Sequence, residues 1–314
     1  MAVKTLGRPR AKGGAAGPLQ SLLWRWQWLR PALLLVPPLA WFVVVYLTSL
    51  VLLLITAFWT IDSFTSQIVQ VWNVENFRTI AVDPTYRLIV VRTVALAALV
   101  TVTDATLAFP FAYFMARVAS RRTQTFLFAA VLLPLWASYL ARVYAWILIL
   151  NHNGLLNWSL QSIGLPPANI GYSNVAMWIV FSYIWLPFMI IPTYAALERV
   201  PESLLEAAAD LGARRWRAVR DVVLPLAMPG VVAGSIFTFS LTLGDFITPI
   251  LIGGAGGKGI RDFLGGSTFI GNVIYTNVGI ASNVPFAAAL ATVPVVIMAV
   301  YLLGAKRLGA FEAL

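Results

Sequence analysis

The chain has 314 residues, of which 60% are hydrophobic and 11% are charged, and its formal net charge is +10. A water-soluble protein of this length needs far more charge to cover its surface, so the composition favours a bilayer protein over a nucleic-acid-binding one. The chain contains no cysteine, which excludes disulfides, thiolate metal sites and cysteine nucleophiles. The single histidine, His152, lies in an expected loop, where a solvated side chain is the ordinary interpretation.

The N-terminal segment, residues 1–30, is basic and low in complexity, and we expect a disordered cytoplasmic tail there. An apolar run then extends from Pro31 to about Phe58. This run is too long for the core of a signal peptide, and no small-residue cleavage site follows it. We therefore expect a membrane anchor that stays attached.

Six segments are apolar over the roughly 20 residues that a helix needs to cross the hydrocarbon core. They cover about 32–58, 88–115, 125–150, 175–197, 226–252 and 285–304. Only helices and closed barrels satisfy the backbone in lipid, and these runs are too long for barrel strands. The sequence therefore predicts an all-α membrane protein, in which residues 31–314 form one domain of six transmembrane helices. Prolines inside these spans predict kinks at Pro110, Pro134, Pro187, Pro192 and Pro294.

Connections rich in lysine and arginine alternate with poor ones, which sets the orientation of the chain. The two tails and the connections 116–124 and 198–225 hold sixteen basic residues. The connections 59–87, 151–174 and 253–284 hold four. Each group falls on one side of a six-span topology, so both termini are predicted to be cytoplasmic.

The cytoplasmic connection 198–225 is rich in helix-forming residues. We expect a short helix from Ser203 to Leu211, ended by Gly212 in the left-handed conformation. A second short helix is expected from Arg214 to Asp221, stopped before Pro225. Two short helices joined by a glycine turn would form a compact protrusion from the membrane.

The spacing of seven residues in this connection resembles the EAA motif of binding-protein-dependent ABC importer permeases. That motif reads EAA, three residues, Gly, nine residues, Ile, one residue and Leu-Pro, and this chain departs from it only by a valine for the isoleucine. The matching residues are Glu206, Ala207, Ala208, Gly212, Val222, Leu224 and Pro225. The resemblance implies a type I importer fold whose short coupling helices dock on an ATPase subunit. ATP-driven closure of the ATPase dimer then rocks the permease between inward- and outward-facing states.

Further segments resemble the B-type permease of spermidine/putrescine importers, over roughly residues 72 to 252. They are Trp72–Phe77, Leu133–Trp136, Arg142–Trp146, Gly154–Asn157, Leu186–Glu198 and Gly244–Pro249. The resemblance implies a multi-pass subunit of the bacterial inner membrane. Its implied partners are an ABC ATPase dimer, a second and different permease subunit, and a periplasmic or lipid-anchored solute-binding protein.

The chain shows no ATP-binding motif of its own. The run closest to a Walker A loop, Gly253 to Lys258, continues with Gly259 where that loop needs serine or threonine. We therefore expect no cofactor in this chain, and the resemblance implies that the partner ATPase binds ATP and Mg²⁺.

Four charged residues fall inside the predicted spans, where each costs about 2.5–3.5 kcal/mol at a helix centre and should face protein or water. They are Arg92, Asp104, Arg142 and Asp245. An acidic side chain on the pathway suits a cationic polyamine, and the best candidate is Asp245, followed by Asp104. Cation–π contacts to an amine are expected from Trp136, Tyr144, Trp146 and Trp185. The structural alternative is that both aspartates pair with the two arginines and that the aromatic residues face lipid.

Three other functions remain open at this point. The same importer mechanism would serve another small solute, such as an amino-acid derivative, an organic cation or an organic anion. An ion-coupled secondary transporter needs internal repeats and an ionisable relay, and no repeat is visible. A membrane enzyme needs clustered catalytic residues, whereas this chain has one histidine and twelve scattered acidic residues. A non-catalytic transport subunit powered by a partner is the leading interpretation.

Overall fold

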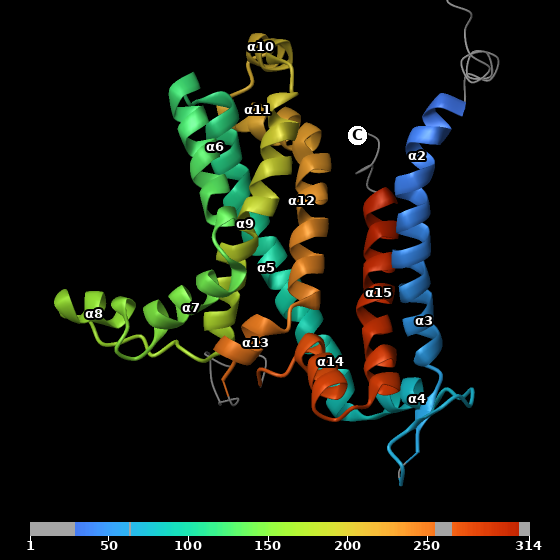
Figure 1. Cartoon of the computed structure of the whole chain (residues 1–314). Coiled ribbons are helices and arrows are strands. Elements are labelled where there is room, and N and C mark those ends of the chain that lie inside the picture. Colours follow the sequence, from blue (N-terminus) through green and yellow to red (C-terminus); the bar gives the residue numbers. More distant parts are fainter. Residues whose placement is uncertain (1–28, 63, 255–265, 308–314) are drawn as a thin grey trace, which may run out of the picture. The chain divides into compact units, whose positions relative to one another are not determined.

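The computed structural model describes residues 29–62, 64–254 and 266–307, and most of that length is helical (Figure 1). The expected basic tail, up to residue 28, and Lys258 lie outside these ranges. The chain divides into two compact units, Met1–Ile55 and Thr56–Leu314. Within the described residues, five helices are long and apolar enough to cross a membrane, and a bent helix pair makes a sixth span if it counts as one.

The described part of the first unit is a continuous apolar helix. It consists of α2 (Leu29–Trp41), the π-helical stretch η1 (Phe42–Leu47) and the start of α3 (Thr48–Thr56). Its membrane-length part, Leu34–Thr56, has a mean hydropathy of 2.5. The side chains from Leu34 to Ser49 are exposed. A helix that is apolar all round is stable in lipid but not in water, so this helix has the character of the expected N-terminal anchor.

The second unit begins with a small hairpin on the predicted outer side. Strands β1 (Thr60–Ile61) and β2 (Ile68–Val69) pair antiparallel. Asp62 Oδ1 accepts hydrogen bonds from two backbone N–H groups of the turn, at 2.8 and 2.9 Å. These donors favour the charged carboxylate and hold the pKa of Asp62 below its usual value. Helix α4 (Glu75–Val82) follows the hairpin.

Capping side chains set the starts of three long helices. Asp83, Ser120 and Ser173 each accept a hydrogen bond from a backbone N–H group in the first turn that follows them. These bonds satisfy donors that the start of a helix leaves unpaired. The three helices are α5 (Pro84–Arg117), α6 (Arg121–Trp136) and α9 (Asn174–Glu198).

Three helices that pack pairwise, α5, α9 and α12 (Leu224–Gly244), form the core of the second unit. Their contact faces bury apolar side chains such as Ala108, Met189 and Leu197. Gly230 of α12 allows a close approach to α9, because a Cβ there would lie 2.5 Å from Pro192 O. Small residues at a crossing are the usual device by which membrane helices pack tightly.

The C-terminal part adds two helices to this core, α14 (Ile270–Gly279) and α15 (Val284–Arg307). The Tyr301 ring of α15 stacks on Phe239 of α12 at 4.8 Å, and its hydroxyl donates to Ser235 Oγ at 2.7 Å. The Ile270 N–H of α14 donates to Thr93 Oγ1 of α5 at 3.1 Å. Both helices are thereby fixed to the core by a hydrogen bond from a distant part of the chain.

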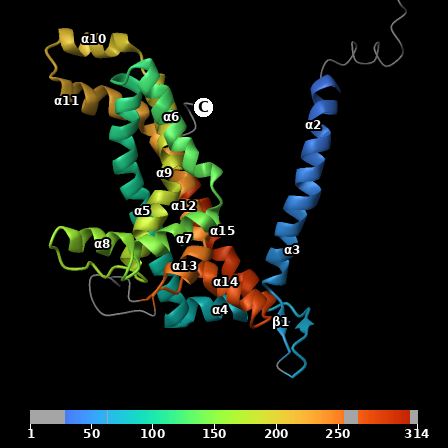
Figure 2. The same cartoon turned by 60° about the vertical axis from the view of Figure 1, so that its left-hand side comes forward.

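The predicted span 125–150 is not one helix. It breaks after α6, and α7 (Tyr139–Leu150) and α8 (Leu155–Ser162) follow at 96°. Pro134 removes a backbone donor from the last turn of α6, and Ala137 then adopts an extended conformation (φ −74°, ψ 143°). The expected kink is therefore a full break, and Figure 1 and Figure 2 both show α8 projecting from the bundle.

The predicted span 226–252 also breaks. Helix α12 ends at Gly244, and Asp245 is extended (φ −72°, ψ 132°) before the short helix α13 (Ile247–Ile252). A glycine and a residue that can cap the next helix stand together at this point, and this pair favours a helix end. Asp245 consequently lies at a helix break and not in the middle of a span.

The second short helix of the cytoplasmic connection also differs from the prediction. The first matches, as α10 (Glu202–Asp210). The second does not stop before Pro225 but continues through α11 (Arg215–Ala218) and the π-helical turn η2 (Val219–Val223) into α12. Pro225 lies in the first turn of α12, where the wider π turn before it relieves the clash of the ring with the preceding carbonyl groups.

The close contact at Gly230 gives a test of the helix packing. We expect Gly230→Ala to destabilise the protein by about 1–3 kcal/mol, because the new methyl group overpacks against Pro192 O and Ala196 Cβ. The matched control is Gly304→Ala in α15, where nothing lies within 4 Å of the added carbon. The midpoint of thermal unfolding in detergent measures both variants, and equal midpoints would contradict the packing described here.

Candidate functional site

A pocket of about 380 Å³ lies where the two helix breaks meet, and we name it the outer pocket. Three helices supply its walls: α7, α9 and the end of α12. The lining residues are Tyr139, Trp185, Ser240, Leu241, Gly244, Asp245 and Phe246. The pocket depends on the two breaks, because Tyr139 begins α7 and Asp245 follows the last residue of α12.

Asp245 is held on both carboxylate oxygens. Oδ1 accepts from the backbone N–H groups of Ile247 (2.8 Å) and Thr248 (3.2 Å), so Asp245 caps α13. Oδ2 accepts from the Tyr139 hydroxyl and from Thr248 Oγ1 at 3.2 Å. Four donors therefore fix an acidic group in the wall of an otherwise largely apolar pocket.

Aromatic rings surround this carboxylate. The rings of Tyr139 and Trp185 stack with centroids 5.9 Å apart, and Phe246 stacks on Tyr275 of α14 at 4.9 Å. Arg142 Cζ lies 5.9 Å from the centroid of the Tyr139 ring, and Arg142 is not among the residues that line the pocket. An acidic group framed by aromatic faces is the arrangement that recognises organic ammonium groups.

The structure brings together two of the residues predicted for the pathway, Asp245 and Trp185. Trp136 and Tyr144 are 91% and 54% exposed and do not line the outer pocket, and Trp146 packs edge-on against Tyr183 at 5.3 Å. Tyr139 is a site residue that the sequence did not reveal. Its hydrogen bond to Asp245 joins residues 106 positions apart, and no local pattern reports such a contact.

Asp104 is fully buried in α5 and does not line the outer pocket. Its nearest polar neighbour is the Ser182 hydroxyl, and among the described residues neither carboxyl oxygen makes a hydrogen bond of good geometry. The ion pairs in the described part of the chain join Arg78 to Glu75 and Arg220 to Asp221. The structural alternative expected ion pairs between the two intramembrane aspartates and the two intramembrane arginines, and neither aspartate forms one there. Arg92 donates to Thr268 O at 3.2 Å.

The cytoplasmic connection forms a second candidate site. Helix α10 carries Glu206, Ala207 and Ala208 and ends at Asp210, and Gly212 follows in the predicted left-handed conformation with φ +79°. The Gly212 N–H donates to Ala209 O (2.8 Å) and the Ala213 N–H donates to Ala208 O (2.9 Å). This is the Schellman arrangement, which needs a left-handed residue and so explains the glycine. The remaining predicted residues follow on the second arm: Val222 in η2, and Leu224 and Pro225 at the start of α12.

This connection presents apolar side chains to solvent. Leu211 is 89% exposed and Trp216 is 72% exposed, on either side of the turn. Arg117 of α5 fixes the base of the connection, because its guanidinium donates to Leu197 O (2.7 Å) and to Val200 O. The side chains of Leu211 and Trp216 give the connection an exposed apolar surface.

Comparisons with known proteins agree with this architecture. The family described as "Binding-protein-dependent transport system inner membrane component" matches residues 108–308. The chain is 45% identical, over the full length of both proteins, to "Inner membrane ABC transporter permease protein YdcU" of Escherichia coli (strain K12). It is 33% identical to "Spermidine/putrescine transport system permease protein PotB" of Haemophilus influenzae, over 72% of this chain and 76% of the relative.

A solved structure shares the fold. The chain resembles a chain of a bacterial alginate ABC transporter, solved in complex with an alginate pentasaccharide-bound periplasmic protein. The TM-score is 0.73 at 19% identity, over 94% of this chain and 98% of that chain. This likeness concerns the fold alone, and it agrees with the predicted type I importer arrangement.

Proposed function

The chain belongs to the family of binding-protein-dependent transport system inner membrane components, and from that premise we propose that it carries a polyamine, such as spermidine or putrescine, in an ATP-driven importer. As an ABC transporter permease, it is a multi-pass transport subunit of the inner membrane. The observation that carries the polyamine proposal is the fixed carboxylate of Asp245 in the aromatic outer pocket.

The chemistry of the outer pocket favours an ammonium group. The Asp245 carboxylate supplies the opposite charge, and Tyr139 and Trp185 supply ring faces within the same pocket. A pocket of about 380 Å³ is large enough for part of a small solute. The similarity to a relative named as a spermidine/putrescine permease supports the same solute class.

The proposed energy source is a partner ATPase dimer that holds ATP and Mg²⁺. Its docking surface on this chain is α10 with the turn at Gly212, where Leu211 and Trp216 are exposed. The second arm of this surface continues as one helix from Arg215 to Gly244. A movement of the ATPase would therefore be transmitted along this helix to the wall of the outer pocket. A second, different permease subunit and a solute-binding protein complete the proposed importer.

A second candidate solute is an organic anion. Arg142 Nε and Nη1 are buried and have no hydrogen-bond partner among the described residues, and the guanidinium lies against a ring that lines the outer pocket. A rearrangement of Tyr139 would expose this charge to a carboxylate or phosphonate. The importer mechanism is the same for both solutes, and only the solute differs.

A substitution at Gly212 tests whether the cytoplasmic connection docks on the ATPase. Gly212→Ala places a Cβ in the left-handed region at a cost of about 1 kcal/mol, which shifts the turn approximately fivefold toward conformations other than the one that docks. We expect ATP-driven uptake to fall while the amount of permease in the membrane stays constant. The matched control is Gly164→Ala after α8, because Gly164 has φ +78°, nothing within 4 Å of an added Cβ, and the same pair of capping hydrogen bonds. Equal losses in both variants would argue against a docking role.

A substitution at Asp245 tests whether its carboxylate contacts the solute. Asp245→Asn keeps an oxygen that can cap α13 but removes the charge, and we expect polyamine uptake at saturating binding protein to fall about tenfold, the value of one charge-assisted contact. The control is Asp104→Asn, the same substitution at a second intramembrane aspartate that does not line the pocket, and it should leave uptake near normal. Unchanged uptake in Asp245→Asn would exclude Asp245 as a contact of the solute.

A further inference from the structure

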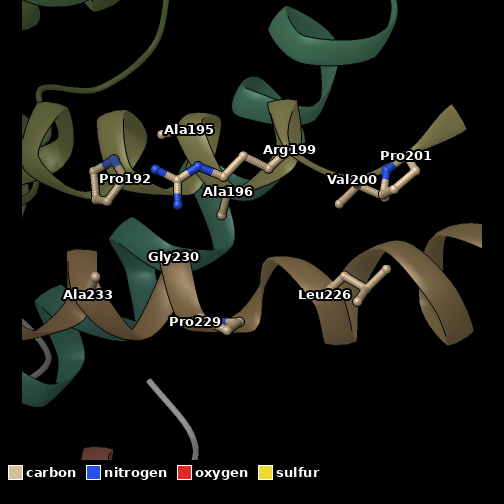
Figure 3. A pocket seen from close by; sticks show the side chains of 10 residues that line it. All are labelled: Pro192, Ala195, Ala196, Arg199, Val200, Pro201, Leu226, Pro229, Gly230 and Ala233. Carbon is tan, nitrogen blue, oxygen red and sulfur yellow. The ribbon is translucent and has the colours of Figure 1, made fainter. Parts of the chain in front are cut away.

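A second pocket lies on the same pair of helices, toward the cytoplasmic loop, and we name it the inner pocket. It encloses about 230 Å³ between the end of α9 and the start of α12. Figure 3 shows α9 and α12 on either side of it, with the Arg199 side chain lying back along α9 toward Pro192. Apart from Arg199, its lining is alanine, proline, glycine, valine and leucine.

The two pockets share one face of the helix pair. On α9, the outer-pocket residue Trp185 and the inner-pocket residue Pro192 are seven positions apart, which is close to two full turns. On α12, the inner-pocket residue Ala233 and the outer-pocket residue Ser240 have the same spacing. Each helix therefore directs its outer- and inner-pocket residues to the same side.

Two phenylalanines lie between the two sets of pocket residues on that face, and the side chain of Phe237 is 53% exposed. Phe188 of α9 lies between Trp185 and Pro192, and Phe237 of α12 lies between Ala233 and Ser240. Their ring centroids are 6.5 Å apart, with 32° between the ring planes. Phe188 also contacts Trp185 at 5.9 Å, which joins the pair to the aromatic wall of the outer pocket.

We propose that Phe188 and Phe237 form an aromatic constriction that divides the solute path into the outer and the inner pocket. The proposal rests on the proposed transport function, and it adds which residues separate the two compartments. Paired phenyl rings remove water from a narrow path and so block small hydrated ions. Their faces still attract an organic cation during passage.

The charges at the two ends give the path a direction. The outer pocket holds the carboxylate of Asp245, whereas the inner pocket has Arg199 and no acidic residue among the described residues of its lining. A cation is therefore attracted to the outer side of the constriction, where the carboxylate lies. Under this arrangement the outer pocket is the binding compartment, and the inner pocket, whose described lining contains no acidic residue, is the exit.

The chain has no cysteine, so single cysteines report accessibility without background. The test uses the assembled complex in sealed inside-out vesicles without ATP, treated with a membrane-impermeant charged maleimide. Ala233→Cys reports the inner pocket and Ser240→Cys reports the outer pocket. Val300→Cys on α15, whose native side chain is 65% exposed on an apolar helix, is the control for a lipid-facing position.

We expect rapid labelling of Ala233→Cys and labelling of Ser240→Cys that is about tenfold slower, because the hydrophobic constriction excludes a hydrated reagent. Adding Phe237→Ala should bring Ser240→Cys close to the rate of Ala233→Cys, and Phe237→Leu should give an intermediate rate. The leucine variant keeps an apolar side chain and guards against loss of the fold.

Three results would overturn the proposal. They are an inner-pocket cysteine as protected as the Val300→Cys control, equal rates for the two pocket cysteines before Phe237 is changed, and no acceleration in either Phe237 variant. The first result would assign this face to lipid or to another subunit. Labelling does not depend on which solute is carried. If polyamine uptake failed but the labelling pattern were as expected, the polyamine assignment would be rejected and the constriction would be retained.

Discussion

The arrangement of this protein depends on how it satisfies a broken helix inside a membrane. Each break exposes backbone groups that lipid cannot hydrogen-bond, so a partner within the protein must replace water. Asp245 provides that partner by capping α13, and the Tyr139 hydroxyl at the start of α7 bonds the same carboxylate. One side-chain contact therefore joins both helix breaks, and the outer pocket exists because the two breaks are held together.

A single helix connects the predicted cytoplasmic side to the outer pocket. The helix from Arg215 to Gly244 has 30 residues and thus spans about 45 Å at 1.5 Å per residue. One end adjoins the exposed turn at Gly212 and the other ends beside Asp245. In the proposed mechanism, movement at the ATPase surface shifts this helix as a unit. The phenylalanine pair lies along its length, where a small rotation would open or close the path.

Local patterns in the sequence predicted the parts of the structure that local interactions form. The helix ended by Gly212 was predictable because a glycine after a run of helix formers has few other uses, and the long spans were predictable from their apolar length. The breaks at Ala137 and Asp245 were not, because Pro134 and Gly244 are also tolerated inside membrane helices. Tyr139 was missed for a different reason, because its partner Asp245 lies 106 positions away in the sequence. The predicted helix end before Pro225 was wrong, because the π-helical turn η2 accommodates the proline ring and the helix continues.

The most direct test of the central claim is the ATPase activity of the complex purified through a tag on this chain, with its solute-binding protein added. We expect spermidine or putrescine to stimulate ATP hydrolysis, whereas amino acids, other organic cations and sugars should not. Stimulation only by a different solute would contradict the polyamine assignment and leave the importer mechanism in place. If no ATPase copurified with the chain, the docking surface around Gly212 would be refuted first.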